Sequence, residues 1–454
     1  MYDLLIKNAR VVTADEVIAA AVAVKDGKVA AVLAGETPVP ARQVLDLTGK
    51  YLLPGVIDCH VHFNEPGYTW REEFAQGSRA AAAGGVTTVI DMPMQNRPPV
   101  IDREVFARKA ELLQGKSAID YGFWGALIKT NLDKLSGLQE AGTLAFKCFM
   151  CNPGQDYTAL DIAEIEQVLV TLREFDGLAG FHCEDYAMIE RLQTASLATG
   201  KTGRRDYLAA RPVEAELKAV NDIIALLDKT EGRAHICHVS HPAVAEAIRQ
   251  AKVKGLDITA ETCVHYLLFT GEDLVNEGPR FKCSPPLRTA ADRKKLWDYV
   301  LDGTLDCICS DHSPCAPEEK AEASETGTFG AWGGISGVQT SLQAFWDLAI
   351  TQKGADPSLV ARVMSINPAA IFGLDGVKGT VMPGRDADFT VIDPQKNWEI
   401  TADELLYKHK FSAFTGLSGT GAPVMTIVRG QVVMEDGRLR DGYTGQLVRR
   451  CREE

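Results

Sequence analysis

The sequence predicts an α/β protein in which a (β/α)8 TIM barrel carries a small β-sandwich domain formed by both termini. Two observations lead to this prediction. The middle of the chain alternates short apolar runs with amphipathic helical stretches, whereas both ends contain short strand patterns around tight turns. We therefore expect a barrel domain at residues 51–384 and a composite β-sandwich domain at residues 1–50 and 385–454.

About eight apolar runs supply the strands of the predicted barrel, and eight is the number that closes this fold. The runs lie at residues 55–57, 87–90, 121–126, 144–147, 178–182, 234–238, 258–262 and 306–310. Helical patterns separate several of them, for example at residues 79–83 and 242–252. Because active sites of this fold lie at the C-terminal ends of the strands, reactive side chains should follow the runs.

Both ends of the chain are typical of β structure. Short strand patterns lie at residues 4–6, 10–12, 21–24, 28–32, 388–393 and 424–433. Asp26-Gly27 separates two of these patterns, and Asp-Gly between alternating runs is a strong hairpin signal. The two ends therefore predict one β domain that both termini build.

The composition indicates a globular protein without an affinity for polyanions. The chain has 454 residues, 46% of them hydrophobic, and a formal net charge of −13. This charge argues against nucleic-acid or anionic-membrane partners, because no excess of positive charge is present to release counterions. Neither a signal peptide nor a run of about 18 apolar residues is visible, so we expect a cytoplasmic protein.

The 11 cysteines fit a reducing compartment, in which they act as small buried hydrophobes. Four of them, Cys59, Cys148, Cys183 and Cys237, are neighbours of the candidate ligands described next. Because adjacent residues of a strand point to opposite faces, we expect these thiols to pack outward against helices.

Six metal-compatible side chains follow five of the eight apolar runs. They are His60, His62, Lys147, His182, His238 and Asp311. His60 and His62 share one face of a strand and form a natural chelating pair. Any one of the six could instead be a core histidine, a loop cap or a lysine at the rim, but their coincidence predicts a metal centre. We expect His235, His241, His265 and His409 to be hydrogen-bonded core residues.

The ligand types predict a binuclear site that hydrolyses amides. His60, His62 and Asp311 would hold one ion, and His182 and His238 the other. A lysine ammonium beside a dication is unfavourable, whereas the carbamate that Lys147 forms with CO2 is anionic and bridges two ions. Asp311 would take a proton from the attacking water and give it to the leaving nitrogen. These ligands suit zinc, cobalt, manganese or iron.

Three further motifs give the chain a family resemblance. Pro54-Gly55-Val56-Ile57-Asp58-Cys59-His60-Val61-His62, Gly84-Gly85-Val86-Thr87-Thr88 and Pro383-Gly384-Arg385-Asp386-Ala387-Asp388 span nearly its whole length. The chain resembles the cyclic amidohydrolases, a group of hydantoinases or dihydropyrimidinases, dihydroorotases and allantoinases. This resemblance implies a TIM barrel with a β-sandwich flank, a carboxylated Lys147, two zinc-type ions and a homotetramer. It also implies a small cyclic amide or ureide as substrate.

Within this group the sequence is most similar to the allantoinase pattern. Met94 and Gln95 follow Met92-Pro93 where dihydroorotases carry an Asn for the substrate carboxylate. Hydantoinases carry a Tyr closer to the bridging lysine than Tyr157 is here. The resemblance therefore implies hydrolysis of allantoin to allantoate, a step of purine metabolism. A hydantoinase or dihydropyrimidinase acting on hydantoins or dihydropyrimidines is the alternative, and a metal-free scaffold is a third reading.

Two positions are candidates for substrate contact. Ser284 would bind through its backbone groups, although it could instead be a turn residue before Pro285-Pro286. Trp332 lies in the long segment 313–337, which exceeds the usual connection of about 2–6 residues. This segment would be either a lid over the site or a solvated surface loop.

Overall fold

Eight parallel strands form the barrel in the computed structural model, which describes residues 1–34, 39–154, 157–440 and 442–451. Their order in the sheet follows the chain. The strands are β6 (Val56–Val61), β7 (Val86–Asp91), β8 (Asp120–Ala126), β9 (Ala145–Phe149), β10 (Ala179–His182), β11 (Ala234–Ile236), β12 (Ile258–Cys263) and β13 (Cys307–Cys309). A parallel bridge between Val61 and His312 joins the two ends of the sheet. Each strand overlaps one of the predicted runs, and the predicted barrel is confirmed.

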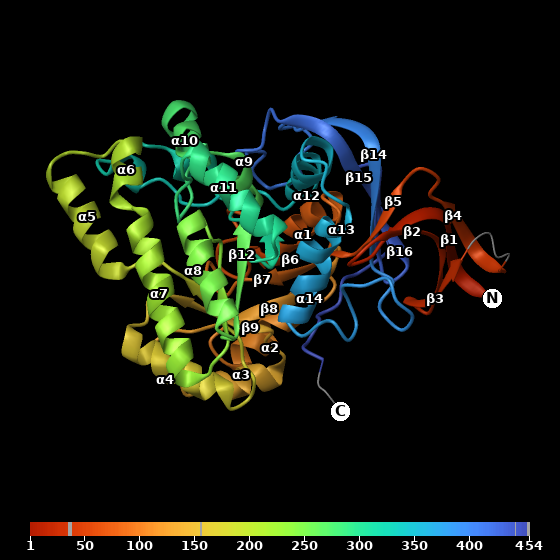
Figure 1. Ribbon diagram of the computed structural model, residues 1–454, viewed down its shortest axis with the longest axis horizontal. Helices are drawn as coiled ribbons and strands as arrows, with labels where there is room; N and C mark the ends of the chain where they lie inside the picture. Colours follow the sequence, from red (N-terminus) through yellow and green to blue (C-terminus); the bar gives the residue numbers. More distant parts are fainter. Residues whose placement is uncertain (35–38, 155–156, 441, 452–454) are drawn as a thin grey trace.

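Helices surround the barrel strands (Figure 1). The longer ones are α1 (Phe74–Ala83), α2 (Arg103–Leu113), α4 (Ile162–Arg173), α5 (Tyr186–Ala198), α7 (Val213–Thr230), α8 (Pro242–Val253) and α11 (Ala290–Leu301). The shorter ones are α3 (Leu135–Ala141), α6 (Arg204–Ala210), α9 (Val264–Leu268), α10 (Gly271–Glu277), α12 (Ser341–Trp346), α13 (Ser358–Ala361) and α14 (Asn367–Ile371). Single turns and π-helical pieces are η1 (Pro279–Phe281), η2 (Pro317–Lys320), η3 (Gly327–Phe329), η4 (Asp347–Gln352) and η5 (Arg362–Ile366). None of the helices in the described part of the chain is long and apolar enough to cross a membrane.

Helix α7 shows how the sequence sets these helices against the barrel. Glu214 and Glu216 lie in its first turn and Lys229 in its last, which suits the helix dipole. Besides Glu216, its buried residues recur at helical spacing, at Ala215, Ala219, Val220, Ile223, Leu226, Leu227 and Thr230. This stripe faces the strands, while the helix flanks contact α4 and α8.

The two ends of the chain build one nine-stranded sheet beside the barrel (Figure 1). Its strands are β1 (Tyr2–Val12), β2 (Val17–Lys25), β3 (Lys28–Ala34), β4 (Ala41–Asp46), β5 (Tyr51–Pro54), β14 (Phe389–Glu399), β15 (Ser418–Val428), β16 (Gln431–Glu435) and β17 (Arg438–Leu439). The predicted hairpin is confirmed, because β2 and β3 pair across Asp26 and Gly27, both with positive φ.

The strand pairing places the boundary between the barrel and the terminal β domain differently from the prediction. Strand β5 lies in the region that we assigned to the barrel, but it pairs with β1 and β14 and belongs to the terminal sheet. At the other end, Leu447 forms a bridge with Tyr121 of barrel strand β8. The terminal β domain therefore gains residues 51–54, and part of the C-terminal tail returns to the barrel. The remaining domain boundaries stay predictions.

Candidate active site

The structure brings the six predicted ligands together at the C-terminal end of the barrel. His60 lies in β6 and His62 directly after it, Lys147 lies in β9, and His182 ends β10. His238 and Asp311 follow β11 and β13. All six are buried, and they line one cavity of about 550 Å³. Parallel strands of a closed barrel aim their ends at a common centre, which is why residues so distant in sequence meet here.

Asp311 links the first histidine pair. Its Oδ1 atom lies 3.2 Å from His60 Nε2 and 3.3 Å from His62 Nε2. Burial alone would raise the pKa of the Asp311 carboxyl, but the facing His60 and His62 rings outweigh it and hold this pKa far below its usual range. Asp311 has a φ of 44° and His238 a φ of 40°. A positive φ is uncommon for residues other than glycine, although aspartate and histidine adopt it more readily than most.

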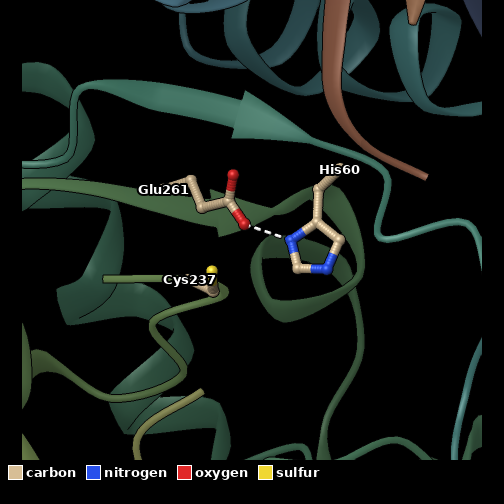
Figure 2. Close-up of side chains that lie close together, drawn as sticks. All are labelled: His60, Cys237 and Glu261. Atoms are coloured by element: carbon tan, nitrogen blue, oxygen red, sulfur yellow. Dashed lines mark hydrogen bonds and ion pairs between the residues drawn. The ribbon is translucent and has the colours of Figure 1, made fainter. Parts of the chain in front are cut away.

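A buried carboxylate, Glu261 of β12, pairs with His60 (Figure 2). It bonds with His60 Nδ1, which leaves His60 Nε2 facing Asp311. Glu261 also accepts one hydrogen bond from Cys59 Sγ and forms another with His235 Nε2, each at 3.2 Å. Burial opposes the charge of Glu261, but the His60 and His235 rings prevail and keep its pKa well below the usual range.

Glu261 was missed in the sequence, although one signal was available. It is the single charged residue of the run Ile258-Thr259-Ala260-Glu261-Thr262, which is otherwise apolar or hydroxylated. A charge inside a barrel strand is rarely buried unless it has a partner. This position therefore indicates a carboxylate that serves a polar group inside the barrel.

The second histidine pair has a carboxylate of its own. His182 Nδ1 lies 3.0 Å from His238 Nε2, and His182 Nε2 lies 2.8 Å from Glu184 Oε2. The guanidinium of Arg211 pairs with the same Glu184 oxygen. Burial acts to raise the pKa of Glu184, but Arg211 and His182 lower it to about 2. Like Glu261, Glu184 fixes the orientation of one imidazole.

Lys147 reaches the centre between the two pairs. It is 1% exposed, and its Nζ atom forms no hydrogen bond within the part of the chain that the structure describes. Its Nζ lies 5.2 Å from the centroid of the Phe149 ring. A buried amine without an acceptor is costly for a protein, which marks this position as one that another group completes.

The prediction that the neighbouring thiols face outward is wrong for two of them. Cys59 contacts Glu261, and Cys237 Sγ lies with the ligand atoms of His60 and Glu261 within 4.8 Å of one another (Figure 2). Strict alternation fails at both places. The pairing of β6 is irregular around Asp58 and Val61, and Cys237 lies beyond the end of β11. All eleven cysteines are free, and all but Cys451 are buried.

The four histidines expected in the core differ from one another. His235 bonds with Thr259 and Glu261 as expected, and His241 caps α8 through Ala243. His409 bonds with the carbonyl of Trp70 but is only half-buried. His265 is buried, yet neither ring nitrogen has a hydrogen-bond partner among the described residues. The expectation of a hydrogen-bonded core residue is therefore wrong for His265.

Ser284 and Trp332 both line the cavity. Ser284 Oγ lies 2.7 Å from the hydroxyl of Tyr207. The Trp332 indole donates a hydrogen bond of 3.2 Å to the Ser313 carbonyl, and the Arg71 guanidinium lies 3.8 Å from the centroid of the Trp332 ring. Both residues are therefore positioned to contact a bound molecule, while their role as substrate contacts stays a prediction.

Hydrogen bonds from two lysines and an ion pair hold the segment 313–337 against the barrel. Lys282 donates to the carbonyls of Phe329 and Ala331, and Lys320 donates to the carbonyl of Lys282 at 2.9 Å. Glu322 pairs with Arg204 of α6 at 2.9 Å. These contacts make the segment a wall of the cavity rather than a loop that is solvated throughout. Its movement as a lid stays a prediction.

Comparison with known proteins agrees with this geometry. The model of the amidohydrolase family matches residues 51–433. Allantoinases of Salmonella choleraesuis and Salmonella newport are each 36% identical to this chain over 439 residues, covering 96% of this chain and 95% of theirs.

Solved structures agree as well. An L-hydantoinase (dihydropyrimidinase) from Arthrobacter aurescens aligns with a TM-score of 0.96 at 32% identity, covering 99% of this chain and 100% of its own. A dihydropyrimidinase from Brevibacillus agri aligns with a TM-score of 0.92 at 28% identity, covering 99% of both chains. The barrel, the buried histidine and aspartate cluster and these full-length similarities lead to one conclusion: the chain belongs to the amidohydrolase family.

Proposed function

We propose that this chain hydrolyses the hydantoin ring of allantoin to give allantoate. Similarity to allantoinases over almost the whole chain supports this substrate. The chemistry rests on one observation above all, the meeting of six ligand-type side chains in a single buried cavity. A cavity of about 550 Å³ is within the range that small-molecule sites occupy.

Two divalent ions complete the proposed site. Zinc is our first choice, and cobalt, manganese or iron suit the same ligands. His60, His62 and Asp311 would hold one ion, since their ligand atoms lie within 4.8 Å of one another. His182 and His238 would hold the other, with the facing nitrogens 3.0 Å apart.

Lys147 would help to hold both ions as a carbamate, which forms when its neutral amine adds CO2 and releases a proton to solvent. The buried Nζ has no hydrogen-bond partner among the described residues, and an anionic carbamate would supply oxygen ligands at this position. The adduct also replaces a positive charge on Lys147, which would repel both ions, with a negative charge that attracts them.

The chain's own residues would direct the reaction. Bound ions would polarise the scissile carbonyl and make water nucleophilic near neutral pH. Asp311 would accept the proton of the attacking water and deliver it to the ring nitrogen as the C–N bond breaks. Glu261 and Glu184 would keep His60 and His182 in the orientation that the site requires. Ser284 and Trp332 would position the ring.

A hydantoinase or dihydropyrimidinase activity is the second candidate. The alignment with the Arthrobacter aurescens enzyme at a TM-score of 0.96 favours it. Both candidates use the same ligands, so only the substrate separates them. We further propose a cytoplasmic homotetramer, on the strength of the family resemblance, and light scattering of the purified protein tests the assembly.

The decisive experiment measures initial rates on allantoin, dihydrouracil, hydantoin and dihydroorotate with metal-loaded enzyme in bicarbonate buffer. The proposal expects the highest kcat/KM for allantoin. A higher value for hydantoin or dihydrouracil would transfer the proposal to the second candidate. A protein that purifies without metal and hydrolyses none of the four would instead be a scaffold.

A further inference from the structure

His265 is a buried imidazole that the proposed reaction does not use. It lies in α9, directly after β12, and is 1% exposed. Neither Nδ1 nor Nε2 has a hydrogen-bond partner among the described residues. Buried polar groups are almost always paired in proteins, so an imidazole with two unpaired nitrogens indicates a group that the protein alone does not supply.

Two further ligand-type side chains lie beside His265. The ligand atoms of Cys263, His265 and Asp311 all lie within 4.8 Å of one another, and all three residues are buried. A cation near the centre of this triangle would come within bonding distance of all three after small side-chain shifts, since zinc lies about 2.0–2.3 Å from nitrogen, oxygen and sulfur ligands. A second thiol, Cys309, lies 3.6 Å from Cys263 Sγ.

Two other groups of ligand-type side chains, apart from the ligand set of the proposed binuclear site, are less suited to a cation. In the group of His60, Cys237 and Glu261, the His60 Nδ1 atom is already bonded to Glu261 (Figure 2). The group of three aspartates, Asp120, Asp386 and Asp388, surrounds the buried ammonium of Lys378. Among the histidines of these groups, His265 is the one whose two ring nitrogens both lack a hydrogen-bond partner in the described structure.

We propose that Cys263, His265 and Asp311 form an additional, inhibitory site for a thiophilic divalent cation such as Zn²⁺ or Co²⁺. Binding replaces the thiol proton of Cys263, which is released to solvent. Asp311 is shared with His60 and His62, so a cation at the additional site withdraws this carboxylate from the proposed reaction. The inhibition therefore rests on the role that we propose for Asp311, whereas the binding does not.

Nearby positive charges limit the strength of this site. The His60 ring and the Lys320 ammonium act on His265 and oppose a cation there, and an ion held by His60, His62 and Asp311 would add its own repulsion. The Cys263 thiolate and the Asp311 carboxylate supply two negative charges in its favour. We expect weaker binding here than at the two-histidine sites, so that inhibition follows only when metal exceeds what the active enzyme holds.

The test is a Co²⁺ titration of cobalt-loaded, full-length enzyme. Bound cobalt per chain is measured together with the sulfur-to-cobalt charge-transfer absorption in the near ultraviolet, and hydrolysis is followed in the same samples. Variants Cys263→Ser and His265→Gln remove one ligand each. Cys237→Ser removes the thiol of the competing group, and Cys315→Ser removes a buried thiol outside both groups.

The proposal expects charge-transfer absorption that grows with the additional cobalt and coincides with inhibition. Cys263→Ser abolishes the absorption, while His265→Gln raises the midpoint of the titration at least about tenfold, the lower end of what partners of metal ligands contribute. Cys237→Ser and Cys315→Ser leave both the absorption and the midpoint of the titration unchanged. Absorption that survives Cys263→Ser, disappears in Cys237→Ser or never develops overturns the proposal. Because the absorption reports binding without turnover, a protein that develops it but hydrolyses no allantoin even before the additional cobalt is added refutes the proposed function and leaves this site standing.

Discussion

Replacing Glu261 with Gln tests how the barrel interior supports the proposed metal site. The carboxylate bonds with His60 Nδ1, with Cys59 Sγ at 3.2 Å and with His235 Nε2 at 3.2 Å. Gln has nearly the same shape but no charge, and its amide nitrogen cannot accept a hydrogen bond. The variant therefore keeps the packing of the interior and weakens the support of His60.

The expected size follows from the change in the bond to His60. A hydrogen bond to a charged group contributes about 1.5–3 kcal/mol and one between neutral groups about 0.5–1.5 kcal/mol. The difference, about 1–1.5 kcal/mol, corresponds to roughly a tenfold weaker hold on the ion at His60. This agrees with the loss of about 10–100-fold that such partner residues usually cause.

Metal retention against a chelator measures this change directly. The concentration of dipicolinate that removes half of the more tightly held metal, the ion proposed at His60, from Glu261→Gln should fall by about tenfold relative to the unaltered protein. Glu246→Gln is the matched control, since Glu246 lies on α8 and pairs with Arg249 away from the cavity. Equal midpoints for the two variants would refute the role assigned to Glu261.

Three further predictions follow from buried lysines. Lys147→Met should remove activity and bound metal, measured by metal analysis and initial rates in bicarbonate buffer, because methionine cannot capture CO2. Lys378→Met should lower the free energy of unfolding in urea by about 3–5 kcal/mol, because it removes the cation that pairs with buried Asp388 and leaves Asp120 and Asp386 with Arg429 in its place. Burial lowers the pKa of Lys282 to about 7, so between about pH 7 and 10 the unfolded chain binds a proton there that the folded chain does not. In that window the free energy of unfolding should rise with pH more steeply for the unaltered protein than for Lys282→Met, and parallel curves would contradict this assignment.

The order of the barrel strands could be predicted from the sequence, but one boundary could not. Residues 51–57 form a continuous apolar run, yet β5 ends at Pro54 in the terminal sheet and β6 begins at Val56 in the barrel. Both strands are buried, so periodicity gives no sign of the division. Gly55 marks it, because a Cβ atom there would lie 2.3 Å from Thr87 Oγ1 and 2.7 Å from Asp388 Cβ. That crowding arises from partners far away in sequence.

The ligand-type residues could be found from the sequence because each follows an apolar run, and a barrel gathers the ends of its strands. The partners of their supporting carboxylates could not be predicted. Glu261 contacts His60 from a separate strand, and the charge of Glu184 depends on Arg211 at the end of α6, so both contacts arise from the tertiary structure. The inward thiols were missed for a related reason, since the irregular pairing of β6 breaks the alternation on which the prediction relied.

The two histidine pairs differ in how much negative charge supports them, and this difference predicts the order in which metal leaves. His60 faces both Asp311 and Glu261, and Glu261 is paired only with histidine and thiol groups among the described residues. The pair of His182 and His238 has Glu184, whose charge Arg211 already balances. Chelation should therefore release metal in two phases, with the ion at His182 leaving first. Arg211→Met should slow the fast phase, and Glu261→Gln should accelerate the slow one. Release in a single phase, or an effect of Glu261→Gln on the fast phase, would show that the charge around the two pairs does not govern their hold on metal.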